Sequence, residues 1–485
     1  MPVSKKDDHE SSMVKSVRTP VLPRTAAWRD IWSLAWPQTL LMFCNFLIGF
    51  VDVWVAGRIG SDVQASMGMI NQLLFFFLVV ATAVANGSVA AISQSMGAGL
   101  PRRALRYTGL VLEAGLVMGL AIFALGMFID DGLLALLQVP DGLRPITSYF
   151  LDVYLLLLPV YYLFLITHAV FRAQRMVFVP LFSGIITALV NTVADLGLGL
   201  GMWGLPNLGY QGVAWATFFS VSCGTLFNLF VLWRRGLLRR ESFAPWCWIR
   251  QAWPYLFRVA WPGGLMQVVW QSAYLALFAV TGSLPHENVA ALAGMSAGMR
   301  VEAGLFLPGF AFNMTASILV GEYLGAGRPD MAKRATYRIL GVGVAVLTLV
   351  AVGVWLVMEP LAAFVAPDPA VQAQAMGYLR WNLLAIPFTL TSMILAGALA
   401  GAGATIYNLL AFGCAAWLVR VPTAYILGHH VLGDSTGVWI SMFVSQVFQS
   451  SLALGIFHFR DWSKFAMRRR KTLTGATNGT QLRTH

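Results

Sequence analysis

Long apolar stretches separated by short polar breaks dominate the pattern along the chain. About twelve stretches are long enough to cross a hydrocarbon core of roughly 30 Å as helices. The breaks between them are rich in Gly, Pro, Asp and Arg. The pattern therefore predicts an all-α polytopic membrane protein. The expected spans are residues 34–56, 67–96, 107–129, 147–171, 178–200, 211–233, 255–281, 291–321, 338–358, 374–399, 406–427 and 437–458.

The second half of the chain repeats the first. "WPQTLL" at Trp36 returns as "WPGGLM" at Trp261, and "GAGLPRRALR" at Gly97 returns as "GAGRPDMAKRA" at Gly325. "GVAWATFFS" returns as "GVWISMFVS", so three motifs recur in the same order and at nearly the same offset. Each repeat holds about six spans, an even number, so both halves enter the membrane the same way up. We expect two six-helix bundles related by a pseudo-two-fold axis along the membrane normal.

This repeat divides the chain into five parts. A tail precedes the first bundle, a basic linker joins the bundles, and a second tail follows. The expected boundaries are 1–29 for the N-terminal tail, 30–233 for the first bundle, 234–253 for the linker, 254–460 for the second bundle and 461–485 for the C-terminal tail.

Positive charge falls almost entirely on one side of the predicted membrane. The chain has 33 Lys and Arg residues and a formal net charge of +12. With the N-terminus placed in the cytoplasm, 28 of them lie in cytoplasmic segments, two on the opposite side and three within spans. This bias predicts a multi-pass membrane protein with both termini cytoplasmic. The basic charge then faces anionic lipid, and nucleic acid is not an expected partner.

Composition gives no indication of an enzyme. Hydrophobic residues make up 58% of the chain and charged residues only 11%, which leaves no room for a large soluble domain. The cysteines form no CxxC pair, the seven histidines do not cluster, and neither DDxxD nor HExxH occurs. We expect no cofactor. The four cysteines are Cys44, Cys223, Cys247 and Cys414.

Four acids of the first half lie within predicted spans, where a charge costs roughly 2.5–3.5 kcal/mol at mid-bilayer, and two of them have polar residues of interest around them. Asp52 belongs to the first span, in "GFVDVWVAGRIG", and Asp195 to the fifth, in "VNTVADLGLG". Asn191 precedes Asp195 by four residues, so both project from one helix face. Thr217 in the sixth span adds another oxygen donor. Such oxygens suit Na⁺, and two neighbouring buried acids can take up a proton. Alternatively, Asn191 and Asp195 tie two helices together.

The repeat helps to choose between these alternatives. Shifted by the repeat offset, Asp52 falls near residues 277–280 and Asp195 near Thr423, where the second half has no acid. A structural role common to both bundles would be expected in both, so this asymmetry favours a specific role in the first bundle. We assign structural roles to the other first-half acids, Glu113 and Asp152, and to Glu322 in the second half.

The second half carries charged groups of its own. Arg300 and Glu302, in "GMRVEAGLFLPGF", are two residues apart and do not share a helix face, so one of them is expected to face the cleft. Arg380 and Arg420 are also intramembrane cations. Arg300, Glu302 and Arg420 form a candidate substrate site or second-bundle polar site, although we favour structural pairing for the arginines.

Two prolines stand near the beginning of corresponding spans. Pro37 precedes most of the first span and Pro262 most of the seventh. One interpretation is that each lies in a first helical turn. If the helices begin earlier, near Trp28 and Trp253, the same prolines would kink them, and the first helix could bend when Asp52 changes charge.

The motifs together resemble the MATE (multidrug and toxic compound extrusion) family over about residues 30–460. The similarity is carried by "WP" before the first span, "FVDVWVAGRIGS", "GAGLPRRA", "NTVADLGLG", "PNLGYQGVAWAT", "RVEAGLFLPGF" and "LVGEYLGAGRP". "FRAQR" departs from the family by replacing a glycine-containing turn after the fourth span, whereas the second half keeps "LAGAGAT". The resemblance implies a coupling-cation site at Asp52, Asn191, Asp195 and Thr217, and bending of the first helix at Pro37.

The function implied by the resemblance is export of organic, mostly cationic or amphiphilic compounds, coupled to entry of H⁺ or Na⁺. The transporter is expected to work by alternating access of its two bundles, as a monomer in the lipid bilayer. The resemblance to the prokaryotic branch of the family implies that this bilayer is the plasma membrane of a bacterium, the inner membrane. The alternative is a flippase for lipid-linked saccharides of the same superfamily. A flippase should line its cleft with cations for pyrophosphate, and the predicted first-half spans contain none, so this alternative ranks second. Nothing in the sequence resembles the selectivity filter of a channel.

Overall fold

The structure is a computed structural model that describes residues 27–136, 138–286, 288–366 and 368–467. Most of both predicted tails, 1–29 and 461–485, therefore lies outside the described residues. Twelve helices are long and apolar enough to span a membrane, and the described chain contains no strand. The prediction of an all-α protein with twelve spans is confirmed.

The first half contributes six spans and two short connecting helices. Most of these helices extend several residues beyond the predicted apolar cores because their polar end turns are helical as well. The helices are α2 (Trp28–Ile59), α3 (Ser61–Gly97), α4 (Pro101–Phe128), the short α5 (Asp130–Leu136), α6 (Arg144–Ala173), α7 (Phe178–Ala194), which continues as a π-helix η1 (Asp195–Gly199), the short η2 (Met202–Gly204) and α8 (Tyr210–Arg234).

The second half repeats this order. After the short η3 (Arg240–Ser242), α9 begins inside the predicted linker, and the eleventh span consists of α-helical and π-helical segments in series. The helices are α9 (Trp246–Gly282), α10 (Asn288–Gly325), α11 (Pro329–Leu356), the short α12 (Met358–Val365), α13 (Pro369–Ala402), α14 (Thr405–Gly413), η4 (Cys414–Arg420), α15 (Val421–Tyr425), η5 (Ile426–Val431), α16 (Ser435–Phe459) and η6 (Trp462–Phe465).

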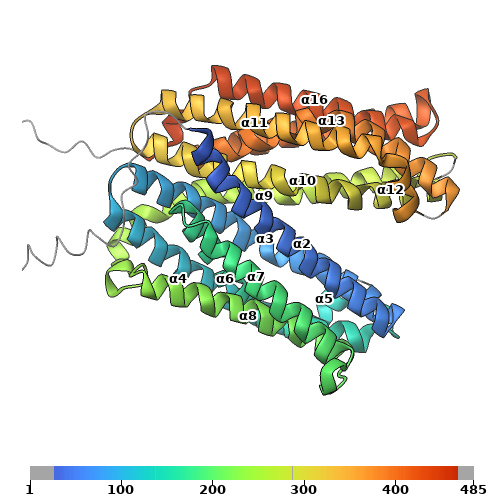
Figure 1. The fold of residues 1–485 in the computed structure, drawn as a ribbon, viewed down its shortest axis with the longest axis horizontal. Coiled ribbons are helices and arrows are strands. Elements are labelled where there is room, and N and C mark those ends of the chain that lie inside the picture. The colour runs from blue at the N-terminus through green and yellow to red at the C-terminus, as the bar shows by residue number, and fades with distance from the viewer. Residues whose placement is uncertain (1–26, 137, 287, 367, 468–485) are drawn as a thin grey trace, which may run out of the picture.

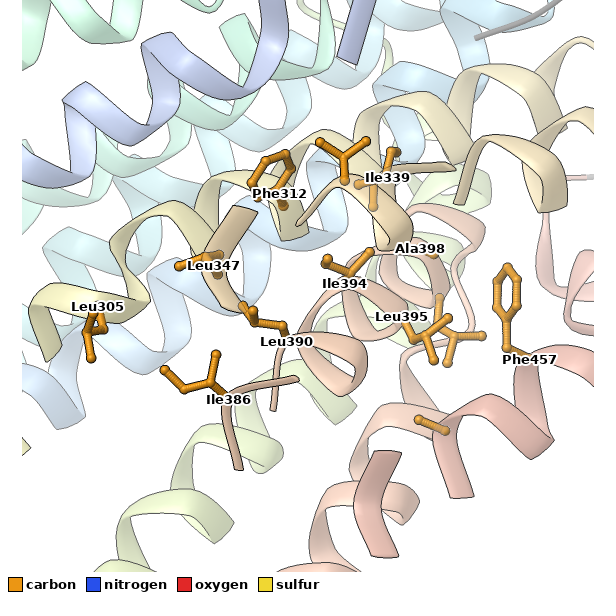
Figure 2. Close-up of a cluster of buried hydrophobic side chains, with 14 of the residues drawn as sticks. Leu305, Phe312, Ile339, Leu347, Ile386, Leu390, Ile394, Leu395, Ala398 and Phe457 are labelled. Carbon is orange, nitrogen blue, oxygen red and sulfur yellow. The ribbon is translucent and has the colours of Figure 1, made fainter. Parts of the chain in front are cut away.

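The two repeats form two bundles that lie side by side (Figure 1). The core of the second bundle is built from aliphatic and aromatic side chains of α10, α11, α13 and α16, among them Phe312, Ile394 and Phe457 (Figure 2). The first turns of α2, at Ile31 and Leu34, belong to this same second-bundle core. The first helix therefore begins against one bundle and continues into the other.

Pro37 and Pro262 both lie inside helices rather than in first turns. Helix α2 begins at Trp28 and α9 at Trp246, well before their prolines. The interpretation of these prolines as helix starts is wrong, and the alternative of an earlier start is correct. Since proline lacks an N–H group, each interrupts the backbone hydrogen bonding of a long helix and provides a place where it can bend.

The bundles touch where α3 and α10 end, and they spread apart toward α5 and α12 (Figure 1). A side chain on Gly97 would collide with the backbone of Glu322, and one on Gly325 would collide with the backbone of Gln94. In the repeat, Gly97 corresponds to Gly325 and Gln94 to Glu322. The ends of α3 and α10 therefore cross with their backbones in contact, and the pseudo-two-fold axis relates one side of the contact to the other. We call Gln94, Gly97, Glu322 and Gly325 the interbundle contact.

Among the described residues, an ion pair stabilises this contact on one side only. Arg175 follows α6, and its Nε lies 2.8 Å from both carboxylate oxygens of Glu322 in α10; Nη2 contacts the same carboxylate. On the symmetric side, Gln94 donates to the Gly401 carbonyl at 2.8 Å. Arg175 has a left-handed backbone, with φ 59°, and Gly403, its counterpart in the second repeat, has φ 80°. The arginine therefore occupies the turn where the second repeat keeps its glycine.

Candidate functional site

A cavity of about 500 Å³ lies between the two bundles. Its wall includes Asn45 of α2 and His168 of α6 from the first bundle, and Trp270 of α9 and Met442 of α16 from the second. The volume falls within the range of pockets for drug-sized ligands. A mostly apolar wall with a few polar groups suits amphiphilic organic molecules.

The structure brings Asp52, Asn191 and Asp195 together beside this cavity, inside the first bundle. The side chains of Asp195 and Asn191 both lie against the Asp52 carboxyl group. All three residues are buried, with 7%, 0% and 0% of their surface exposed for Asp52, Asn191 and Asp195. The two carboxylates come from α2 and from the first residue of η1, so helices distant in the sequence build the cluster together.

The cluster is short of hydrogen bonds. Five of its buried polar atoms have no hydrogen-bond partner among the described residues. They are Asp52 Oδ1, the oxygen and nitrogen of the Asn191 amide, and both carboxylate oxygens of Asp195. Buried polar atoms are normally paired. Two adjacent carboxylates can pair only if one carries a proton or a cation lies between them. The donor set of carboxylate and amide oxygens therefore fits a proton or a hard monovalent cation.

The backbone that carries Asp195 departs from regular α-helix. Residues Asp195–Gly199 form a π-helical turn, a type of irregularity that often occurs at functional sites. A side chain on Gly212, in the first turn of α8, would collide with the Leu198 carbonyl. Glycine at this position therefore lets α8 pack directly on the π-helical turn.

Tyrosines of α6 connect the cluster with Thr217 and with the cavity. Tyr154 is buried next to Thr217, Asp52 and Asp195. Tyr161, two turns further along α6, lines the cavity and also lies near Asp52. The Thr217 hydroxyl donates to the Val213 carbonyl at 3.4 Å within α8. The structure thus places Thr217 next to Tyr154, which itself lies near both acids.

Helix α2 carries both the cavity wall and Asp52 on one face. Leu41, Asn45 and Ile48 line the cavity, and with Asp52 they recur at alternating four- and three-residue steps. This spacing keeps them on the same side of a helix. Pro37 lies one turn before Leu41. A change at Asp52 and a change in the cavity therefore act on the same helix face, and Pro37 supplies a point about which that face can move.

The second bundle holds a different polar site. Glu302 and Arg420 both line the cavity, and the Tyr378 hydroxyl donates to the Glu302 carboxylate. Arg420 Nε donates to the Ser445 hydroxyl at 2.9 Å, and its guanidinium lies 5.7 Å from the centre of the Tyr274 ring. Arg420 is the last residue of the π-helical segment η4 in the eleventh span, which corresponds to the fifth span in the repeat.

The remaining intramembrane charges lie elsewhere. Arg300 and Arg380 are exposed and do not line the cavity, so the structure separates Arg300 from the predicted group with Glu302 and Arg420. Of the acids assigned structural roles, Glu322 is buried in its pair with Arg175, Glu113 is half-buried and Asp152 is exposed.

Sequence reasoning missed a polar stripe on α6. Tyr154, Tyr161 and His168 are spaced by seven residues and Arg172 follows four later, so the four side chains share a face. Tyr161, His168 and Arg172 all line the cavity. The predicted span 147–171 ends one residue before Arg172, whereas α6 continues to Ala173 and includes it. The spacing of seven within an apolar span was the signal that could have found this stripe.

Twelve apolar helices in two symmetric bundles, with a central cavity and a buried acid pair, define a membrane transporter built from parallel repeats. The sequence profile of the MatE family matches residues 37–196 and 262–426. The chain belongs to this family. The predicted resemblance is confirmed, and the chain is a multi-pass membrane transporter of small compounds rather than an enzyme.

Two relatives and one solved structure match this chain over most of its length. "Probable multidrug resistance protein NorM" of Thermotoga maritima is 24% identical over 461 residues, which cover 90% of this chain and 94% of that protein. "Multidrug resistance protein PmpM" of Pseudomonas aeruginosa is 26% identical over 432 residues, 85% and 87% of the two chains. A crystal structure of the Vibrio cholerae MATE transporter VcmN matches with a TM-score of 0.80 at 19% identity, covering 92% and 96%.

Proposed function

We propose that the protein is a cation-coupled multidrug antiporter. It exports amphiphilic organic compounds through the central cavity in exchange for H⁺ or Na⁺ bound at Asp52, Asn191, Asp195 and Thr217. The observation that carries this proposal is the group of five buried, unpartnered polar atoms on Asp52, Asn191 and Asp195. The names of the relatives, two of them multidrug resistance proteins, support the export of drug-like compounds.

The proposed cycle follows from the position of the acid pair. With the termini in the cytoplasm, the interbundle contact closes the cytoplasmic end, and the bundles spread apart on the outer side. A cation entering from outside is held between Asp52 and Asp195 and cancels one of their two negative charges. This removes the repulsion between the carboxylates and lets α2, η1 and α8 pack more closely.

Neutralisation is transmitted to the cavity through α2 and α6. Asp52 shares its helix face with Asn45 and Ile48, and Tyr161 lies near Asp52 while also lining the cavity. A shift of α2 about Pro37 therefore changes the cavity wall and releases the compound outward. The carrier then turns inward, and the cation leaves to the cytoplasm. One charge crossing 100 mV supplies about 2.3 kcal/mol, enough for a roughly 50-fold concentration ratio.

Gradient-driven efflux from proteoliposomes tests this function. Vesicles loaded with a fluorescent amphiphilic compound receive an inward gradient of H⁺ or, separately, of Na⁺. We expect one of the gradients to accelerate efflux by the wild type, and Asp195→Asn to reduce efflux to the rate of protein-free vesicles. Asp152→Asn makes the same substitution at an exposed acid of α6 and should leave efflux unchanged. Equal, gradient-driven efflux by wild type and Asp195→Asn would refute the site.

A further inference from the structure

The charges that line the central cavity are mostly positive. Of the described residues in its wall, three are charged, namely Arg172, Glu302 and Arg420. The two arginines come from different bundles, Arg172 from the last turn of α6 and Arg420 from η4. The wall therefore carries a net charge of +1, which differs from the acidic wall expected for a binder of organic cations.

The single acid in the wall is already engaged. Glu302 accepts a hydrogen bond from the buried Tyr378 hydroxyl and lies near Arg420. The Tyr378 carbonyl in turn accepts a hydrogen bond from Asn382 at 3.0 Å, which fixes this part of α13. Glu302 is thus oriented by groups of the second bundle, and a cationic compound would have to compete with Arg420 for it.

Arg172 has no counter-charge in the described chain. It is 8% exposed, lines both the central cavity and a neighbouring cavity of about 90 Å³, and forms no ion pair with a described acid. His168 lies one turn earlier on the same face of α6, and its Nε2 is buried without a partner among the described residues. An unpaired guanidinium in a low-dielectric wall is costly, and an anionic group on a ligand would relieve that cost.

The opposite wall supplies a surface for flat rings. The Trp270 ring stacks on Phe412 at 5.4 Å and on Tyr274 at 6.1 Å between ring centres. Tyr274 also lies under the Arg420 guanidinium. Trp270, Phe412, Tyr274 and Arg420 all line the cavity. This wall therefore combines an aromatic platform with a guanidinium that can pair with a carboxylate through two parallel hydrogen bonds.

We propose that the cavity selects amphiphilic organic compounds that carry a carboxylate, as anions or zwitterions, with Arg172 and Arg420 as the groups that recognise it. The aromatic body of the compound stacks on Trp270. The inference rests on the proposed export function and specifies its substrate class. It differs from the preference for cations that family resemblance implies.

Equilibrium binding without any ion gradient tests this preference separately from coupling. The probes are a rhodamine dye with a free carboxylate and the methyl ester of the same dye, which share a ring system and differ in that one charge. Binding to protein in lipid nanodiscs is followed by fluorescence polarisation. We expect the wild type to bind the carboxylate form at least about 10-fold more tightly than the ester. Equal affinities, or tighter binding of the ester, would overturn the proposal.

Variants identify the groups responsible. Arg172→Gln and Arg420→Gln should each weaken binding of the carboxylate dye by about 10-fold or more and leave ester binding unchanged. Arg172→Lys keeps the charge without the paired geometry and should lie in between. Arg380→Gln removes an exposed arginine of α13 and serves as the control. Equal loss of both dyes in the glutamine variants would show a structural role for the arginines and overturn their assignment.

Failure of this inference and failure of the export function give different results. If binding favours the carboxylate but no gradient drives efflux, the substrate class stands and the antiport mechanism falls. If a gradient drives efflux of the ester and the carboxylate dye does not bind, antiport stands and the substrate class falls.

Discussion

Arg175 is expected to set how firmly the interbundle contact stays closed. Its guanidinium bridges from the end of α6 to Glu322 in α10, and this carboxylate has only 1% of its side-chain surface exposed. Replacing Arg175 with Ala leaves the Glu322 charge buried without its partner. Opening of the contact would give that charge access to water. The substitution should therefore destabilise the closed arrangement relative to the open one.

The size of the effect follows from burial. Removing one partner of a buried ion pair costs about 3–5 kcal/mol. The Arg175 side chain keeps 24% of its surface exposed, so we take the lower end, about 3 kcal/mol. That corresponds to a decrease on the order of 100-fold in the ratio of closed to open protein. Replacing both residues with Leu removes the buried charge as well and should restore most of the closed population.

Distances between spin labels measure this ratio. Arg234 at the end of α8 and Arg334 in α11 are exposed, belong to different bundles and lie at the end where the interbundle contact forms. With spin-labelled cysteines at these two positions, double electron–electron resonance should show one short distance in the otherwise wild-type protein. In Arg175→Ala, a longer distance should predominate. Unchanged distances in Arg175→Ala would contradict a role of the Arg175–Glu322 ion pair in keeping the contact closed. The native cysteines to be replaced first are Cys44, Cys223, Cys247 and Cys414.

Three further predictions concern α2, α3 and the assembly. Gly97→Val places a side chain against the Glu322 backbone, so we expect a loss of about 1–3 kcal/mol of stability. Thermal unfolding in detergent measures this loss, and Gly341→Val, where a side chain meets open space, is the control. Pro37→Ala restores a backbone N–H and should stiffen α2, which lowers the efflux rate at unchanged equilibrium binding; unchanged efflux would contradict a bending role. Light scattering of detergent-solubilised protein should give one 52.9 kDa chain per particle, and a dimer mass would refute the monomer.

The helices and the acid cluster could be predicted from sequence for physical reasons. A span must be apolar for about 20 residues, so its position is visible in a single chain. Asp52 and Asp195 stood out because a carboxylate in an apolar span is costly. The spacing of Asn191 and Asp195 fixed their common face before any tertiary contact was known.

The positions of Arg172 and Arg175 relative to the helix end could not be predicted from the sequence. Both follow an apolar run, and an arginine at such a position is equally consistent with a loop and with a last helical turn. Arg172 lies inside α6 and lines the cavity, whereas Arg175 lies in the turn and crosses to the other bundle. The premise that the first-half spans contain no cation, which ranked the flippase second, is therefore wrong, although the relatives give that alternative no support. Only the helix end and the packing of the bundles distinguish the two arginines.

The proposed mechanism requires that the Asp52–Asn191–Asp195 cluster bind the exchanged cation. The most direct measurement reverses the coupling, with an outward substrate gradient across proteoliposomes that contain no ion gradient. Internal pH is read with a pH-sensitive dye and sodium entry with radioactive Na⁺. We expect substrate efflux to drive entry of one of these ions in the wild type and in Asp152→Asn. We expect Asp52→Asn and Asp195→Asn to abolish this entry. Substrate-driven ion entry that persists in both cluster variants would contradict the proposed mechanism.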